Sequence, residues 1–501
     1  MAESLRVVVV GGGVGGMAAA LRLRAAGHEV TLLERNQELG GKLAARHRDG
    51  FSFDTGPSLL TLPEVFAQLA AVAGRRLDEL VELVRLDPVC RYRFADGSRL
   101  DARAEPAAML AEVERFSPGS GPAWTAFQAR AARIWAAAEP TFFAGALDLA
   151  GLARRAGGPG ALAAIDPLPT LAGRARRSFA DARLAQYAMR YATYSGSSPY
   201  LAPATLACIS WIEQRFGAWY VRGGLAALGA ALAGLLAATG VEVRTGVEVG
   251  AVCADAATVT GVDLAVGGHL PADAVVANVD AAHLYRDLLP DRRAAARVAR
   301  AGRSSSGFVV LAGVRGRTQG LAHHNLWFSA DYRAEQADIF ERDQAPRDPT
   351  VYACCSALTD PSQAPDGDEN WFLLVNVPSG RTERWAGLAD GYRDHVLEVL
   401  AGRGADLAGR LAFTETITPA EIEARWRADA GAIYGTGSNS RRAAFMRPAN
   451  RGPRRGLYLA GGSAHPGGGL PLVAMSGAIA AGLVAEDLAA GRLGRRGAVA
   501  S

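Results

Sequence analysis

The sequence predicts an α/β protein whose parallel sheet is assembled from separated stretches of chain, with an α+β region inserted between them. Two observations favour this architecture. An apolar run at Leu5–Val10 leads directly into a glycine-rich turn and a helix pattern, as the first strand of a parallel sheet does. Further buried-strand patterns at 270–278 and 456–462 lie far downstream, so the sheet is completed only late in the chain.

The glycine-rich turn has the spacing of a dinucleotide-binding motif. Gly11 permits the tight turn, Gly13 lets the backbone approach a pyrophosphate, and Gly16 lets the helix pack on the strand. A second strand pattern ends at Glu34, about 20 residues later, where a carboxylate accepts hydrogen bonds from ribose hydroxyls and repels a 2′-phosphate. A glycine-rich turn in another kind of parallel-sheet protein would not require this order, so we expect a Rossmann-type domain that binds NAD or FAD.

The residues after Glu34 distinguish the two cofactors. The run from Glu34 to Lys42 holds a second glycine pair and resembles the flavoprotein family of amine oxidases and carotenoid desaturases, in which an E-x(5)-GG-[RK] extension follows the turn. The resemblance implies FAD, bound without a covalent link, with Gly41 and Lys42 along its pyrophosphate and ribityl chain. Segment 51–57, which contains Gly56, resembles the stretch that returns toward the flavin in this family.

The nucleotide-binding fold is expected to resume later in the chain. Residues 241–249 form a strand–turn–strand pattern, and 270–278 and 456–462 each form one strand pattern. The last strand leads through a glycine-rich loop to a helix predicted over 472–488, with Pro471 in the first turn, where its missing N–H is tolerated. The positive end of this helix would face the flavin edge that becomes negative on reduction. The resemblance implies these further cofactor-binding residues: Val249, Gly461, Gly462 and Leu470.

We therefore expect a discontinuous Rossmann-type FAD-binding domain, an inserted α+β substrate domain and a helical membrane-facing region. The 501 residues fit two or three domains. The predicted FAD-binding pieces are residues 1–85, 221–285 and 451–501. The predicted substrate and membrane-facing region is 86–220, and the second part of the substrate domain is 286–450.

Motifs in the middle of the chain narrow the resemblance. Segments 190–199 and 219–224 are similar to bacterial carotenoid desaturases of the phytoene desaturase type, and the similarity extends over residues 5–490. It implies an enzyme that introduces double bonds into phytoene or a related carotenoid by hydride transfer to flavin. Phytoene desaturases tend to read G-A-G-T-H-P-G-A-G near the end, whereas residues 461–469 read G-G-S-A-H-P-G-G-G. That departure leans toward hydroxycarotenoid 3,4-desaturases or carotene oxidases of the same family.

The sequence assigns no catalytic side chain and no metal. Flavin supplies the redox chemistry while the protein supplies orientation and a dry tunnel, and no Ser-His-Asp arrangement, paired carboxylates or metal-spaced ligands are visible. His465 either assists proton removal or holds its glycine loop, and we favour the structural role. His323 and His324 are interpreted as a strand-end pair bonded to the backbone. No role follows for Glu213 or Arg222.

Two other functions remain open at this stage. A flavin amine oxidase shares the nucleotide-binding segments, but it needs an aromatic cage for its amine, and the carotenoid-type motifs would be unexplained. A flavin-binding carotenoid carrier that has lost turnover would keep the same motifs. A pigment change on co-expression with a carotenoid pathway separates the three hypotheses.

Composition limits the partners. The net charge is +4 with dispersed arginines, so no basic stripe for nucleic acid is present. Five cysteines without a C-x-x-C pair fit a reducing cytoplasm without a disulfide or zinc site. Only one dinucleotide motif is credible, so we expect oxygen or a membrane quinone, rather than NAD(P)H, as electron partner.

The sequence predicts a cytoplasmic protein bound peripherally to membranes. No secretory signal and no spanning helix are expected, because the longest apolar stretch, 225–241, is short for a span and is interpreted as a buried helix. In segment 147–183, leucines lie beside clustered arginines, as in a segment at lipid headgroups. An ordinary amphipathic surface helix explains the pattern equally well. We take this segment as the docking surface, with Arg174, Arg176 and Arg177 as its basic residues.

Overall fold

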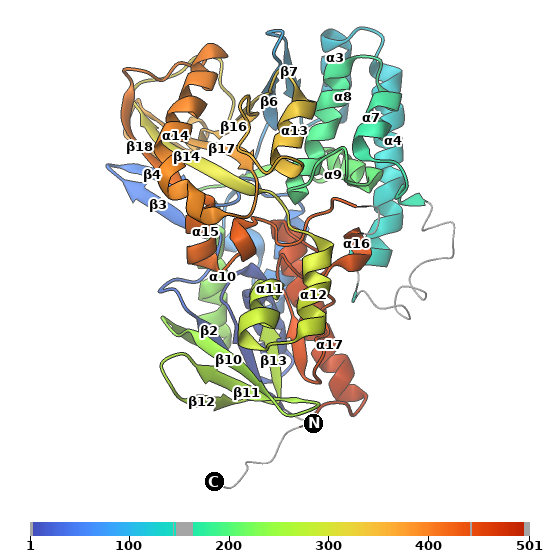
Figure 1. Ribbon diagram of the computed structural model, residues 1–501, viewed down its shortest axis with the longest axis vertical. Helices are drawn as coiled ribbons and strands as arrows, with labels where there is room; N and C mark the ends of the chain where they lie inside the picture. Colours follow the sequence, from blue (N-terminus) through green and yellow to red (C-terminus); the bar gives the residue numbers. More distant parts are fainter. Residues whose placement is uncertain (1–3, 144, 147–163, 441–442, 495–501) are drawn as a thin grey trace.

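The computed structural model describes residues 4–143, 145–146, 164–440 and 443–494, which form two halves stacked along the long axis of the molecule (Figure 1). The lower half is built on a five-stranded parallel sheet in the order β19-β13-β1-β2-β9. Its strands are β1 (Arg6–Val10), β2 (Glu29–Glu34), β9 (Glu242–Thr245), β13 (Ala274–Ala277) and β19 (Leu457–Leu459). The discontinuous parallel sheet expected from the sequence is thus present.

Alternating side chains of β1 bury the two faces of this sheet against different layers. Val7 and Val9 join a core with three helices, whereas Val8 and Val10 join a core with a small antiparallel sheet. The helices are α1 (Val14–Ala25), α10 (Leu225–Thr239) and α17 (Leu470–Ala489). The antiparallel sheet consists of β10 (Val249–Ala254), β11 (Val259–Leu264) and β12 (His269–Pro271).

The prediction of a single strand at 270–278 is wrong. The pattern at 270–278 is two strands, because β12 pairs antiparallel with β11 while β13 pairs parallel with β1. The chain changes sheet at Ala272–Asp273, and the Asp273 carboxylate accepts hydrogen bonds from the Arg6 backbone N–H at 2.8 Å and from its guanidinium at 2.7 Å. This side-chain clamp holds the crossing next to the start of β1.

Two expected helices of this half are confirmed. The apolar stretch 225–241 forms α10, which ends at Gly240 with φ +76°, a left-handed conformation that glycine adopts without strain. The C-terminal helix begins two residues earlier than expected, at Leu470, and keeps Pro471 in its first turn. Among the described residues, α17 is the helix long and apolar enough to cross a membrane, but it packs against α1 as a core helix does.

The upper half is built on a seven-stranded sheet in the order β18-β14-β17-β16-β15-β6-β7. All neighbours are antiparallel except β15 and β6. Phe308 and Val310 of β14 face a core with α14 (Trp385–Gly402), whereas Val309 and Leu311 face the opposite side. The strands are β6 (Cys90–Arg93), β7 (Arg99–Ala102), β14 (Ser306–Val314), β15 (His324–Trp327), β16 (Val351–Cys354), β17 (Glu369–Val377) and β18 (Leu411–Ile417).

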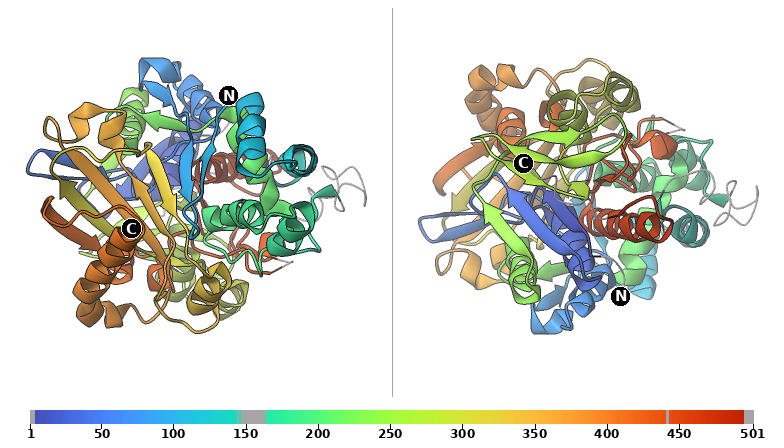
Figure 2. Two further views of the ribbon diagram at one scale, coloured as in Figure 1. Left: turned by 90° about the horizontal axis from the view of Figure 1, so that it is seen from above. Right: turned by 90° about the horizontal axis from the view of Figure 1, so that it is seen from below.

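A helical layer lies beside the β6–β7 edge of this sheet (Figures 1 and 2). It consists of α3 (Pro106–Phe116), α4 (Gly121–Ala138), α7 (Leu171–Ser178), α8 (Ala182–Met189) and α9 (Cys208–Phe216). Stacked aromatic side chains fill its interior, including Trp124, Phe127 and Phe179. Of the segment expected to meet lipid, residues 147–163 lie outside the described residues, and the rest includes α7.

Short elements complete the chain and join the two halves. The Asp54 carboxylate accepts hydrogen bonds from Leu225 and Ala226 at the start of α10, and burial raises the pKa of Asp54 to about 6. The remaining strands are β3 (Ala45–Arg48), β4 (Phe51–Asp54), β5 (Leu83–Arg85) and β8 (Trp219–Val221). The remaining α-helices are α2 (Pro63–Val72), α11 (Ala281–His283), α12 (Arg292–Ala301), α13 (Tyr332–Phe340), α15 (Pro419–Trp426) and α16 (Ala443–Met446).

Candidate active site

A large cavity is lined by residues of both halves. Ten of the eleven residues expected to bind the cofactor line it, namely Gly11, Gly13, Glu34, Gly41, Lys42, Gly56, Val249, Gly461, Gly462 and Leu470. The eleventh, Gly16, lies in the first turn of α1, where an added Cβ would sit 2.1 Å from the carbonyl oxygen of Gly11. The chain segments expected to bind FAD therefore meet at one place, and Gly16 serves the close packing of helix on strand.

Two helices begin at this cavity, each with unsatisfied N–H groups. The residues before their first turns, Gly13 for α1 and Gly469 for α17, have no side chain that could cap the helix, and both line the cavity. A Cβ added at Gly469 would meet nothing within 4 Å, so space remains in front of α17. Helix N-termini bind anionic groups. The arrangement fits FAD: the N-terminus of α1 would hold the pyrophosphate, and that of α17 would stabilise negative charge on the reduced flavin.

Glu34 lies at the end of β2 and is buried. Its Oε2 accepts a hydrogen bond from the Gly12 backbone N–H at 2.7 Å, and Oε1 accepts from the Asn36 backbone N–H at 2.8 Å. The carboxylate thus orders the turn on both sides of the predicted ribose position. Oε1 also accepts a hydrogen bond from the Asn36 side-chain amide at 2.7 Å. A carboxylate offers about four acceptor sites, so about one remains for a ribose hydroxyl.

Lys42 is the only lysine of the chain. Its Nζ donates a hydrogen bond to the carbonyl oxygen of Ile433 at 2.7 Å, which ties the second glycine pair to a segment of the other half. Burial lowers the pKa of Lys42 to about 8, and the nearby Asp280 opposes that shift. The amine is therefore still mostly charged at pH 7 and loses its proton at a lower pH than an exposed lysine.

Sequence reasoning missed two residues that organise the cofactor end. Asn278, at the end of β13, donates from Nδ2 to the Gly11 carbonyl oxygen at 3.1 Å and approaches the Cβ position of Gly13. Trp426 donates from its indole N–H to the Gly41 carbonyl oxygen at 3.0 Å. The strand pattern ending at Asn278 was a signal for the first of them, whereas Trp426 comes from a distant helix and carries no local signal.

The other end of the cavity is lined by side chains rather than by backbone. They come from the seven-stranded sheet, from residues 190–195 after α8, and from the segment that follows α15. The aromatic and aliphatic ones are Tyr92, Tyr194, Leu326, Tyr352, Phe372, Leu374 and Tyr434. The polar ones are Arg190, Thr193, His324 and Asn376.

Arg190 is the cation at this end of the cavity. Its guanidinium donates to the Thr193 hydroxyl and, at 3.4 Å, to Oδ1 of Asn376. Among the residues that the structure describes, no carboxylate forms an ion pair with it. The acidic residues that line the cavity are Glu34, Glu248 and Asp280, and all three belong to the lower half. The upper end of the cavity therefore has, among the described residues, no acidic lining residue that could pair with a cationic ligand.

The interpretation of His323 and His324 is wrong in its bonding partners. Nδ1 of His323 lies 2.7 Å from the Thr359 hydroxyl, and Nδ1 of His324 lies 2.7 Å from the Tyr352 hydroxyl, so both rings bind side chains and not the backbone. Strand β16 brings Tyr352 beside the start of β15, which the sequence pattern does not reveal. Burial lowers the pKa of His323 to about 3 and also lowers that of His324. Both rings are neutral.

These histidines lie close to the Cys354 thiol. The three groups place possible metal-ligating atoms within 4.8 Å of one another. Burial raises the pKa of the Cys354 thiol, so it too is held in its neutral form. All three are buried neutral groups, and of them His324 lines the cavity.

His465 has the structural role that the sequence favoured. The ring is buried outside the cavity lining, and its Nε2 lies 3.1 Å from the carbonyl oxygen of Gly145. Its own carbonyl oxygen accepts hydrogen bonds from Asn450 and Ser476. These contacts hold the glycine-rich loop in front of α17.

The sequence assigned no role to Glu213, but the structure places it next to the cavity. It is buried in α9, and its carboxylate accepts hydrogen bonds from the hydroxyls of Tyr191 at 3.2 Å and Tyr194 at 2.7 Å. Burial raises the pKa of Glu213 to about 7. Since Tyr194 lines the cavity, its hydroxyl links the cavity to a carboxyl group that can take up a proton near neutral pH. Arg222, by contrast, forms a surface ion pair with Glu82 at 2.8 Å.

Comparison with known proteins agrees with this geometry. The sequence model of the family described as flavin containing amine oxidoreductase matches residues 14–485. The chain belongs to this family. It is similar to 4,4'-diapolycopene oxygenase of Methylomonas sp, with 33% identity covering 97% of this chain and 99% of that protein. It is also similar to hydroxyneurosporene desaturase of Rubrivivax gelatinosus, with 36% identity covering 96% of this chain and 94% of that protein.

Solved structures show the same fold. Cyclohexylamine oxidase from Brevibacterium oxydans matches with a TM-score of 0.62 at 18% identity, covering 97% of this chain and 100% of that chain. The family and the fold make the protein an FAD-dependent oxidoreductase. The expected α/β fold, flavoprotein family, cofactor and enzyme class are thereby confirmed.

Proposed function

We propose that the protein is a carotenoid desaturase that removes two hydrogens from a lipophilic polyene. The observation that carries the proposal is the similarity, over nearly the full length of each chain, to two enzymes named for carotenoid-type substrates. The lining of the upper cavity supports it, because aromatic and aliphatic side chains suit a polyene. Desaturation of phytoene, 3,4-desaturation of a hydroxycarotenoid and carotene oxidation all fit this frame.

The same cavity argues against an amine substrate. An ammonium group needs a carboxylate or an aromatic cage free of competing cations. The Arg190 guanidinium lines the upper end of the cavity without an acidic partner among the described residues, so it repels a second cation there. The flavin amine oxidase alternative is disfavoured on this electrostatic ground.

The proposed chemistry divides between cofactor and protein. FAD supplies the acceptor of a hydride when bound. We assign the accompanying proton to the Tyr194–Glu213 pair: the Tyr194 hydroxyl oxygen takes the proton from the substrate carbon as its own proton moves to Oε2 of Glu213, 2.7 Å away. The apolar walls exclude water from the substrate. We also propose that the eleven residues expected from the sequence bind FAD, and that the domains have the boundaries expected from the sequence.

The substrate also implies a membrane, because a polyene of this kind dissolves in lipid and hardly at all in water. We propose peripheral association, with oxygen or a membrane quinone as electron acceptor. Of the three arginines that the sequence suggested for membrane docking, Arg176 and Arg177 of α7 are exposed. Arg174 instead pairs with Asp166 at 2.9 Å and is only partly exposed, so it contributes to the fold.

A direct assay tests the proposed function. Purified holoenzyme is incubated with liposomes that contain phytoene or a hydroxycarotenoid, and separately with putrescine or cyclohexylamine. We expect a red-shifted polyene absorption and a new chromatographic peak with a carotenoid, and no hydrogen peroxide with the amines. Amine oxidation without a change in any carotenoid would overturn the proposal.

A further inference from the structure

Helix α12 carries four exposed arginines in ten residues: Arg292, Arg293, Arg297 and Arg300. Arg293, Arg297 and Arg300 recur at the i, i+4 and i+3 spacing that places side chains on one face of a helix. The helix contains no acidic residue. Like charges at this spacing repel each other, so the helix presents an uncompensated positive face.

These arginines lack the partners that other surface arginines have. Within the described part of the chain, none of the four forms an ion pair or a side-chain hydrogen bond. On α14, in contrast, Arg393 lies 2.8 Å from both Asp390 and Asp394. A basic helix whose guanidinium groups make no ion pair among the described residues offers them to a ligand outside the protein.

The fold holds this helix firmly. The Asp291 carboxylate accepts hydrogen bonds from the backbone N–H groups of Arg293 and Ala294, at 3.0 and 2.9 Å, which caps the N-terminus. Val298 is buried on the inner side. The arginine face is therefore presented by a fixed element.

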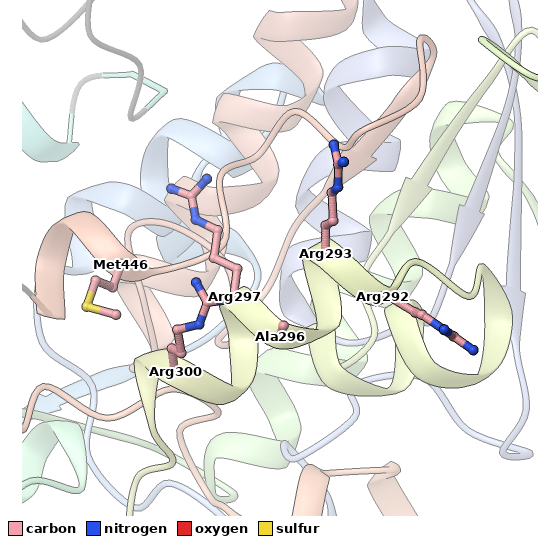
Figure 3. Close-up of a pocket in the computed structure, with 6 residues that line it drawn as sticks. All are labelled: Arg292, Arg293, Ala296, Arg297, Arg300 and Met446. Carbon is pink, nitrogen blue, oxygen red and sulfur yellow. The ribbon is translucent and has the colours of Figure 1, made fainter.

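An open groove runs along the arginine face (Figure 3). Figure 3 shows Arg293, Arg297 and Arg300 projecting from one side of α12, with Met446 of α16 at the end next to Arg300. Arg292 extends away from them, near the start of the helix. The groove is thus lined by four arginines together with Ala296 and Met446.

We infer that α12 docks the protein on an anionic lipid bilayer, with lipid phosphates paired to Arg293, Arg297 and Arg300. The inference rests on the proposed function, which requires access to a substrate dissolved in lipid. Guanidinium groups bind phosphate oxygens in bidentate geometry, and a bilayer offers many phosphates in one plane. The single thioether at the groove does not insert deeply, so the contact is electrostatic and reversible.

The experiment compares two arginine surfaces of the same chain. Wild-type holoenzyme is sedimented with phosphatidylcholine vesicles, with or without about one third phosphatidylglycerol, at low salt and at about 0.5 M salt. The docking variant is R293Q/R297Q/R300Q, and the matched control is R176Q/R177Q on α7. Glutamine removes the charge and keeps good helix propensity, and FAD content reports correct folding.

We expect the wild type to bind only vesicles that contain phosphatidylglycerol and to be released by salt. The docking variant should lose about tenfold or more of its partition coefficient, and the α7 control should lose less. Equal binding of the docking variant and the wild type would overturn the inference, as would wild-type binding to neutral vesicles alone. Absence of any vesicle binding would overturn it too, and would favour an acidic protein as the partner of α12.

Turnover of carotenoid in detergent micelles separates this inference from the proposed function. If the docking variant turns over carotenoid in micelles like the wild type but fails on liposomes, both the surface and the function are supported. If the docking variant turns over carotenoid on liposomes like the wild type, the docking role of α12 is contradicted and the proposed function stands. Loss of vesicle binding by the docking variant, without carotenoid turnover by any form, would support the surface and contradict the function.

Discussion

The two ends of the cavity are built in different ways. The cofactor end is made largely of backbone: Gly13 and Gly469 open two helices toward it, and Gly41 crosses close to Gly13. The upper end is made of side chains from elements far apart in the sequence, such as Tyr194 and Tyr352. Backbone geometry is encoded by short glycine motifs, whereas the upper end exists only once distant strands and helices have packed. The cofactor end should therefore fail when a glycine gains a side chain, and the upper end when a polar partner is removed.

The largest effect is expected from Gly13→Val. The branched side chain enters the cavity in front of α1 and approaches Asn278, whose Nδ2 lies 3.0 Å from the Cβ position. FAD affinity should fall about 1,000-fold or more, which corresponds to at least about 4 kcal/mol, so the purified protein should have lost its flavin. The ratio of flavin to protein absorbance measures it. Gly234→Ala on α10, where a Cβ meets nothing within 4 Å, is the matched control and should keep its flavin. A Gly13→Val protein with normal flavin content would contradict the assignment of the cofactor end.

At the other end of the cavity, Glu213→Gln should lower carotenoid turnover about 100-fold, because a positioned proton acceptor contributes about 10²–10⁴-fold. The flavin content should stay unchanged. Tyr194→Phe should act in the same direction. Tyr191→Phe, which removes the other hydroxyl on Glu213 but lies outside the cavity lining, should act less. An equal loss of carotenoid turnover in Tyr194→Phe and Tyr191→Phe would indicate that the hydrogen bonds to Glu213 serve the fold and not proton transfer.

The pH profile sharpens the same comparison. Since Glu213 must be ionised to accept a proton and its pKa is about 7, wild-type turnover should rise through about pH 7, and this step should vanish in Glu213→Gln. The folded state binds this proton more tightly than the unfolded state, whose pKa is near 4.5. The free energy of unfolding should therefore fall as the pH rises from about 4.5 to about 7, less so in the variant. Urea titrations at the two pH values measure the difference.

A smaller effect on FAD is expected from Glu34→Ala. One charge-assisted hydrogen-bond site is worth about 1.5–3 kcal/mol, so FAD should bind more weakly but remain detectable. Glu34 also orders the turn through Gly12 and Asn36, so the variant should release flavin faster on dilution. Flavin fluorescence on dialysis measures the release. An affinity equal to that of the wild type would remove Glu34 from the ribose site.

No effect at all is expected from pyridine nucleotides. The glycine-rich turn at Gly11 to Gly16 already serves one dinucleotide, and the sequence shows no second credible strand–glycine–helix motif. Anaerobic stopped-flow mixing with NADH or NADPH should leave the flavin absorbance unchanged over many turnover times. Rapid bleaching would contradict the expectation that oxygen or a quinone is the electron partner.

The sequence alone determined the cofactor end of this protein. The motif from Leu5 to Lys42 is nearly continuous, so its turn, helix and acid follow from local backbone preferences and from hydrogen bonds to phosphate and ribose. The helices ending at Gly240 and beginning near Pro471 followed from local signals as well. Resemblance to a family supplied the flavin and the substrate class.

Only the tertiary structure decided the partners of the polar side chains. Strand pairing joined His324 to Tyr352, and helix packing placed Glu213 between Tyr191 and Tyr194. The described part of the fold also leaves the arginines of α12 without ion pairs. Residues 270–278 likewise form two strands only because a second sheet is present, in which β12 pairs with β11. A strand or turn motif acts through neighbours in the chain. The pKa and the role of a buried carboxyl or imidazole depend on groups that only folding brings within a few ångströms.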